Sequence, residues 1–98
     1  MPGRTLLPVI DTIRRKFLSG DYEFAIPHFF EEMADDDLTL AVIHAAIANG
    51  WIRRRFTRDP RGKRYEVVGP TTDGRRAAVI YRIKTTGNLL LITTYLTR

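Results

Sequence analysis

Four strand-like segments joined by short turns fill the second half of the chain, and they constrain the fold more than any other feature. The segments are residues 51–57, 63–70, 75–84 and 88–96. Each join contains Gly together with Pro, Asp or Asn, which are the residues that favour tight turns. Because connections this short place consecutive strands antiparallel, residues 51–98 are predicted to form a four-stranded antiparallel sheet.

Three helices are predicted in the first half. Residues 6–19 carry apolar side chains at helical spacing, and this helix should start near Leu7. Residues 27–35 begin with Pro and run into three aspartates, which oppose the helix dipole and should end the second helix. Thr39 is expected to cap a third helix that ends at Gly50. Residues 21–26 are interpreted as a short edge strand or an extended approach.

Together these elements predict an α+β fold of the RelE-like type, with about three N-terminal helices packed on one face of a four-stranded antiparallel sheet. The 98 residues are expected to form a single domain, with residues 1–20 as an N-terminal helix and 21–98 as the core. The last strand is apolar on both faces, which indicates a central or helix-covered strand. As an alternative, its segment 89–92 is an exposed apolar edge that pairs with a second copy of the chain to form a homodimer.

The charge of the chain is divided unevenly between its halves. Residues 1–50 contain four Lys or Arg against eight Asp or Glu, whereas residues 51–98 contain twelve against three. A basic sheet of this kind favours a polyanionic partner, and RNA is the one we expect. The alternative is a solvated basic face that nearby acids neutralise.

Several kinds of residue and segment are missing from the sequence. It has no cysteine, no apolar run of about 20 residues and no apolar signal segment after Met1. We therefore expect a cytoplasmic protein without a membrane partner. With two His and no Cys it also lacks the spacing of a zinc site, so no metal and no other cofactor are expected.

Short motifs follow one another in a particular order between residues 22 and 95. They are Pro27-His28, Met33, Leu38-Thr39, Asn49-Gly50, Asp59-Pro60-Arg61-Gly62, Arg64-Tyr65, Gly69, Asp73-Gly74-Arg75 and Leu91-Ile92-Thr93-Thr94-Tyr95. In this order they resemble the bacterial domain-of-unknown-function 4258 family and, more distantly, the RelE-like toxin fold. The resemblance implies helices on one face of an antiparallel sheet and a relationship to small endoribonuclease toxins.

The chain departs from the pattern of that family at three places. Family members usually carry Arg where Glu32 and Asp36 stand, and a polar residue or His near Ala78. Where these positions contribute to a phosphate site, the site is weakened here. The alternative to a ribonuclease is therefore a non-catalytic nucleic-acid binder or a protein-interaction module, whose partner would be an acidic, antitoxin-like protein.

Metal-independent RNA cleavage needs an acid/base group and cations that hold the charge on phosphorus. His28 is the predicted acid/base, because His changes its charge near neutral pH. The predicted phosphate clamps are Arg64, Arg76 and Arg82. Either Tyr65 or Tyr95 is predicted to stack on a base or to donate its hydroxyl. Further nucleic-acid contacts are predicted for Arg53, Arg55, Arg61, Lys63, Arg75 and Arg76.

The run Arg53-Arg54-Arg55 should alternate between the two faces of its strand. At least one of the three is therefore expected to turn toward the helices. Because an unpaired buried Arg is costly, it should pair there with an acid.

Overall fold

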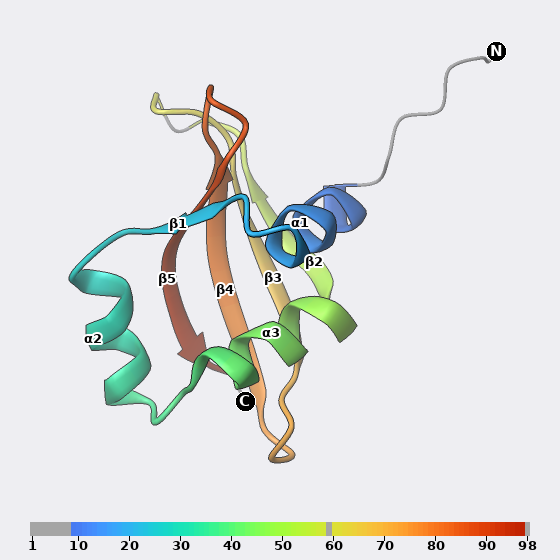
Figure 1. Cartoon of the computed structure of the whole chain (residues 1–98), viewed down its shortest axis with the longest axis vertical. Helices are drawn as coiled ribbons and strands as arrows, with labels where there is room; N and C mark the ends of the chain where they lie inside the picture. Colours follow the sequence, from blue (N-terminus) through green and yellow to red (C-terminus); the bar gives the residue numbers. More distant parts are fainter. Residues whose placement is uncertain (1–8, 59, 98) are drawn as a thin grey trace, which may run out of the picture.

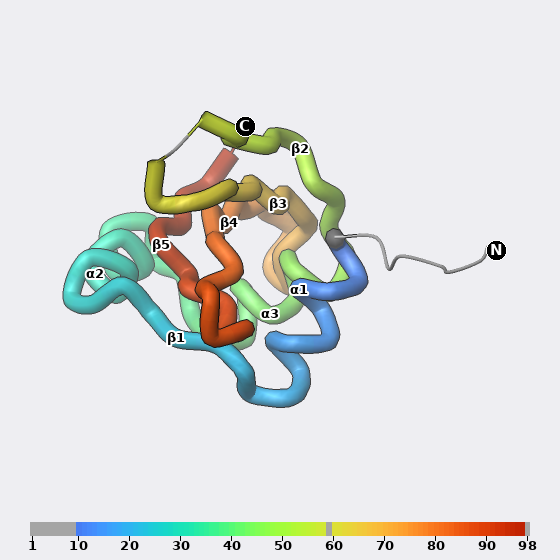
Figure 2. The backbone as a smooth tube through the Cα atoms, turned by 90° about the horizontal axis from the view of Figure 1, so that it is seen from above, coloured from blue at the N-terminus to red at the C-terminus, as the bar shows by residue number. Residues whose placement is uncertain are grey.

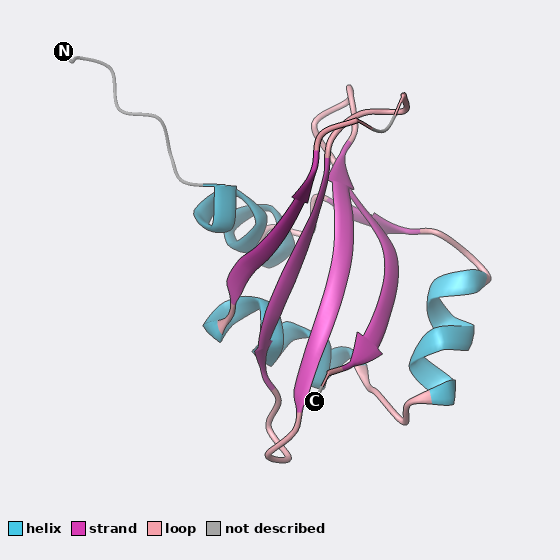
Figure 3. Cartoon of the chain, turned by 180° about the vertical axis from the view of Figure 1, so that it is seen from behind, coloured by secondary structure: helices cyan, strands magenta, loops and turns pink. Residues whose placement is uncertain are grey.

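The computed structural model describes residues 9–58 and 60–97, which form three helices and five strands. The strands make one mixed sheet in the order β1-β5-β4-β3-β2. Seen from the front, the helices lie before the sheet (Figure 1). Seen from behind, the four long strands lie in front, and no helix of the described residues covers them (Figure 3). The α+β class and the one-sided helix layer agree with the prediction.

The four predicted strands are confirmed to within one residue at each end. They are β2 (Trp51–Phe56), β3 (Arg64–Pro70), β4 (Arg76–Ile83) and β5 (Leu89–Leu96), each antiparallel to the next. The turns contain Gly62, Gly74 and Gly87, all with positive φ. This backbone conformation is available to glycine at little cost, which explains why the turns could be located from the sequence.

The prediction of a purely antiparallel, four-stranded sheet is wrong, because β1 (Tyr22–Phe24) adds a fifth, parallel strand beside β5. The N–H of Ala25 donates to the carbonyl of Leu91 over 2.9 Å, and the N–H of Leu89 donates to that of Asp21 over 3.0 Å. The outer edge of β5 is therefore paired within the chain at residues 89–91. This corrects the expectation that residues 89–92 form an open edge for a second chain, while a homodimer as such stays a prediction.

The three predicted helices are present as α1 (Val9–Leu18), α2 (His28–Asp35) and α3 (Leu40–Asn49). The expected start near Leu7 lies outside the described residues. The hydroxyl of Thr39 accepts a 3.2 Å hydrogen bond from the N–H of Val42, which confirms the predicted cap. Within the described part of the chain, no helix combines the length and the apolar character needed to cross a membrane.

The main core lies between the helices and the sheet. From above, the helices and β1 lie on one side of β3, β4 and β5 (Figure 2). Two glycines allow α3 to approach β3 closely. A Cβ atom at Gly50 would lie 2.4 Å from the carbonyl oxygen of Ala46, and one at Gly69 would lie 2.1 Å from the same oxygen. A larger residue at either place would push α3 away from the sheet.

Candidate nucleic-acid interface

The sheet surface that faces away from the helices, called the open face below, gathers many of the arginines. Val67 on β3 and Val79 on β4 belong to the core beneath the helices. Because side chains alternate along a strand, the residues beside them point to the opposite side. The open face includes the polar and aromatic residues Trp51, Arg53, Arg54, Phe56, Arg64, Glu66, Arg76, Arg82 and Tyr95 and the apolar residues Val68, Ala78, Ile80 and Leu90.

A β-bulge in β2 decides which of its side chains reach the open face. Trp51 lies opposite Val68 and Phe56 lies opposite Arg64, with a register shift near Arg53 between them. Strict alternation would place Trp51 and Phe56 on different faces, because they are five residues apart. The extra residue at the bulge brings both rings to the same side. The expected alternation is therefore wrong between Arg53 and Arg54, which share the open face, and confirmed at Arg55, which lies opposite Tyr65 on the side of the helices.

A buried carboxylate holds the middle of the open face together. Glu66 is only 1% exposed. Its Oε1 accepts a hydrogen bond of 2.8 Å from Nε of Arg53 and lies 3.5 Å from Nε of Arg54. Its Oε2 accepts a hydrogen bond from the hydroxyl of Tyr95. By accepting the hydrogen bond from Nε of Arg53, the carboxylate raises the pKa of Arg53. An acid does pair with the arginine run, but it lies on β3 and not among the helices as predicted.

Two arginines lie opposite each other on neighbouring strands of the open face. Arg64 and Arg82 are directly opposite each other in the β3–β4 register. The guanidinium carbon of Arg64 lies 5.1 Å from the centre of the Phe56 ring, within the range of a cation–π contact. Arginines on neighbouring strands suit a bound phosphate, because a phosphate accepts charge-assisted hydrogen bonds from guanidinium groups.

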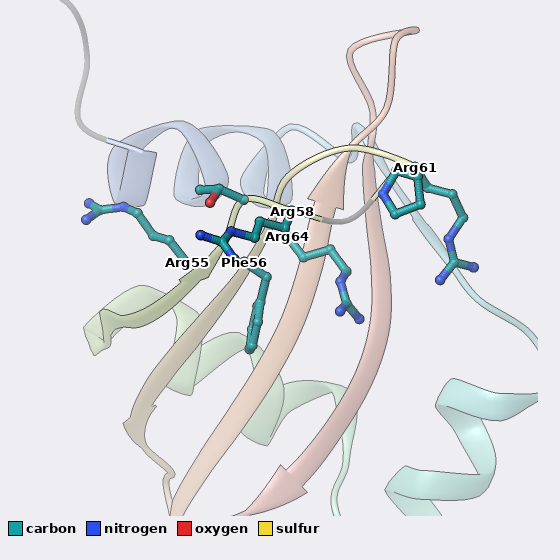
Figure 4. A pocket seen from close by; sticks show the side chains of 7 residues that line it. Arg55, Phe56, Arg58, Arg61 and Arg64 are labelled. Carbon is teal, nitrogen blue, oxygen red and sulfur yellow. The ribbon is translucent and has the colours of Figure 1, made fainter.

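A hollow of about 600 Å³ lies beside the turn between β2 and β3. Its lining includes Arg55, Phe56, Arg58, Arg61 and Arg64. In Figure 4, Arg55 and Arg61 project on opposite sides of the hollow, and Phe56 lies between them. Four arginines lining one hollow create a positive potential that attracts anions.

The sheet divides the predicted catalytic set. Arg64, Arg82 and Tyr95 share the open face. His28, by contrast, is on α2, where its side chain is 55% exposed and its Nε2 lies 3.5 Å from a carboxylate oxygen of Glu32. Tyr65 packs against the core beneath the helices and stacks on Tyr81 at 5.4 Å between ring centres. The structure therefore does not bring His28 and Tyr65 together with the other three.

The cations predicted to contact nucleic acid also differ in their surroundings. Arg75 donates to the carbonyl oxygens of Asp36 (2.9 Å) and Asp37 (3.0 Å), and it pairs with Asp73 at 2.7 Å. It therefore anchors the C-terminal end of α2. Hydrogen bonds from Arg75, and then from Thr71, hold the pKa of Asp73 well below its usual range. The remaining predicted cations are Arg53 and Arg76 on the open face, Arg55 and Arg61 at the hollow, and Lys63 in the exposed turn.

Sequence reasoning did not single out three residues that organise the open face: Glu66, Trp51 and Phe56. Glu66 is the one acidic residue between positions 60 and 72. An isolated acid within so basic a segment is a usable signal for a paired carboxylate. The two aromatic residues gave no comparable signal, because their shared face depends on the bulge.

The family of the domain of unknown function DUF4258 matches residues 27–96, from the residue before α2 to the end of β5. The chain belongs to this family, which confirms the resemblance drawn from the order of its motifs. Both α1 and β1 precede the matched residues. Comparisons with curated proteins and with solved structures gave no match. The relationship to RelE-like toxins stays a prediction.

Proposed function

We propose that this protein binds RNA through the open face of its sheet. The observation that carries the proposal is the set of arginines on a sheet face that no described helix covers, with Arg64 opposite Arg82 in register. Arginine binds phosphate through a planar group with several donors and is well suited to nucleic-acid backbones. Aromatic rings between the arginines favour a nucleic acid over an acidic, antitoxin-like protein, because bases stack on such rings.

Fluorescence anisotropy with a labelled RNA of mixed sequence tests this proposal. The double variant Arg64→Ala/Arg82→Ala should bind about tenfold more weakly or worse, because it loses two charge-assisted phosphate contacts. The slope of log affinity against log salt should fall in magnitude by about 1.4, since each phosphate contact on a single strand contributes about 0.7.

The matched control is Arg15→Ala/Lys16→Ala, which removes the same charge from α1. Its affinity for RNA should stay close to that of the wild type. Equal losses in the two double variants would show that net charge alone governs binding, and the open face would then not be the binding surface.

A second candidate function is metal-independent cleavage of RNA, as in RelE-like toxins. It is favoured by the shared face of Arg64, Arg82 and Tyr95, which places two cations and a hydroxyl on the same side of the sheet. Cleavage in EDTA should fall about tenfold or more in Arg64→Ala. It should persist in His28→Ala, because that side chain lies on α2, away from the open face. Cleavage that depends on His28 and not on Arg64 would argue for a site on the helical side.

A further inference from the structure

Two arginine–aromatic pairs lie at opposite ends of β2 on the open face. At one end Arg64 lies over Phe56, as described. At the other end the guanidinium carbon of Arg76 lies 5.4 Å from the centre of the Trp51 ring. The buried cluster around Glu66 lies between the two pairs. Both rings are thus held beside a cation on a rigid strand.

Trp51 is unusually accessible for an aromatic residue on a sheet. It is 46% exposed, whereas its cross-strand neighbour Val68 is buried. Trp offers a large apolar surface, and leaving it in water forgoes the free energy that burial would give. An exposed Trp ring beside an Arg is the combination on which an unpaired base can stack, with the Arg near the phosphate.

The distance between the rings suits a short strand of nucleic acid. At about 3.3 Å per residue, the five steps from Trp51 to Phe56 span roughly 16 Å of backbone along β2. A single strand several nucleotides long can span both ends of this surface. A duplex cannot use the rings in this way, because its bases are already paired and stacked.

We infer that the open face binds single-stranded RNA in preference to duplex RNA, with one base stacked on Trp51 and the backbone held by Arg76 and the Arg64–Arg82 pair. This inference rests on the proposed function and specifies its substrate. The single-stranded form is favoured by the exposed Trp51 ring, with the half-buried Phe56 ring at the other end of the strand. The choice of RNA rests on the proposed function itself.

The intrinsic fluorescence of Trp51 gives a direct measurement, because it is the chain's only tryptophan. The wild type is titrated with a 12-nucleotide single-stranded RNA, with the same sequence as a duplex, and with heparin as a polyanion without bases. The single strand should quench Trp51 and bind at least fivefold more tightly than the duplex. Heparin should bind without comparable quenching.

Variants at Trp51 separate stacking from charge. Trp51→Ala should weaken single-strand binding about fivefold or more, in line with the loss of one stacked base, whereas Trp51→Phe should retain most of it. Phe30→Ala on α2 is the control, because Phe30 is 44% exposed but lies in the helix layer. Circular dichroism confirms that each variant is folded before binding is compared.

The outcomes distinguish the inference from the proposal on which it rests. Equal binding of single strand and duplex, with Trp51 fluorescence unchanged, would overturn the stacking mode and leave RNA binding by charge in place. Absence of binding to either RNA would overturn both. An equal loss of affinity in Trp51→Ala and Phe30→Ala would also contradict stacking on Trp51.

Discussion

At the scale of single residues, Glu66 is the side chain on which the open face depends. It keeps Arg53 and Arg54 from repelling each other and orients the hydroxyl of Tyr95. A buried carboxylate without these partners would be costly, and the partners without the carboxylate would lose their acceptor.

Replacing Glu66 with Ala is expected to destabilise the fold by about 1–3 kcal/mol, because a buried, hydrogen-bonded charge pair is broken while its arginines can still reach water. Urea unfolding followed by circular dichroism measures this change. Glu31→Ala, on the exposed surface of α2, is the control and should stay within about 0.5 kcal/mol of the wild type. A loss of RNA affinity without a loss of stability would instead assign Glu66 a direct part in binding.

Asp73 links the stability of the fold to pH. Hydrogen bonds from Arg75 and Thr71 lower its pKa in the folded state, whereas in the unfolded chain it titrates near its ordinary value of about 3.9. The folded state therefore gains stability from Asp73 above that value and loses it progressively as the pH falls below it.

The melting temperature of Asp73→Asn should accordingly lie below that of the wild type at pH 7, and the difference should shrink as the pH is lowered from about 5 toward 3. Thermal melts of both proteins across this pH range test whether the difference in melting temperature shrinks in acid. Glu31→Gln controls for the loss of one acidic charge. A gap that widens in acid would mean that Asp73 does not hold its charge through the bonds to Arg75 and Thr71.

At the scale of elements, local signals predicted the long strands, the three helices and, as one of two alternatives, the short strand within residues 21–26, whereas pairing between distant segments could not be predicted. Gly62, Gly74 and Gly87 mark the turns through their own backbone requirements. By contrast, β1 has three residues and becomes a strand only by pairing with β5, far along the chain. The bulge in β2 likewise depends on the β3 register and leaves no mark in the sequence. Turns can be predicted from the few residues that form them, but pairing between segments far apart in the chain cannot.

Arg14 adds hydrogen bonds to the apolar contact between α1 and α3. Nε of Arg14 donates to the carbonyl of Ile47 over 3.1 Å, and Nη2 donates to that of Gly50 over 2.6 Å. These carbonyls lie at the C-terminal end of α3, where the helix itself supplies no donors and a cation is favoured by the dipole.

Arg14→Ala should therefore destabilise the protein by about 1–2 kcal/mol, the value of hydrogen bonds from a charged donor. Denaturant unfolding provides the measurement. Arg15→Ala removes the neighbouring cation, which is exposed on α1, and should change stability by less than about 0.5 kcal/mol. Similar losses of stability in both variants would mean that the charge on α1, and not the hydrogen bonds to the end of α3, stabilises the protein.

At the scale of the whole molecule, the sheet separates two chemically different sides. Residues 9–50, which contain eight of the eleven acids, supply the helices that cover one face, and the arginine-rich open face forms the other (Figures 1 and 3). The uneven charge of the two halves could be inferred from the sequence. The separation of His28 from Arg64 could not, because it depends on which face of the sheet α2 covers. A catalytic set assembled from residue types alone therefore combined groups from both sides.

The two edges of the sheet are protected in different ways. The edge formed by β2 carries three consecutive arginines and a bulge, which discourage pairing with another chain. The apolar strand β5 is instead covered by β1, whose pairing extends to the bond from Ala25 to Leu91. Without β1, an apolar strand would present unpaired backbone groups, the arrangement that promotes association between sheets.

Ala25→Pro removes the N–H that donates to Leu91 and should loosen this end of β1. The variant is expected to self-associate at lower concentration than the wild type, because β5 then offers its edge to a second chain. Light scattering coupled to size-exclusion chromatography, over a range of concentrations, measures the effect. Ala25→Gly keeps the donor and should behave like the wild type. If both variants associate equally, the side chain of Ala25 and not its hydrogen bond protects the edge; if neither associates beyond the wild type, β1 is not what keeps β5 from pairing with another chain.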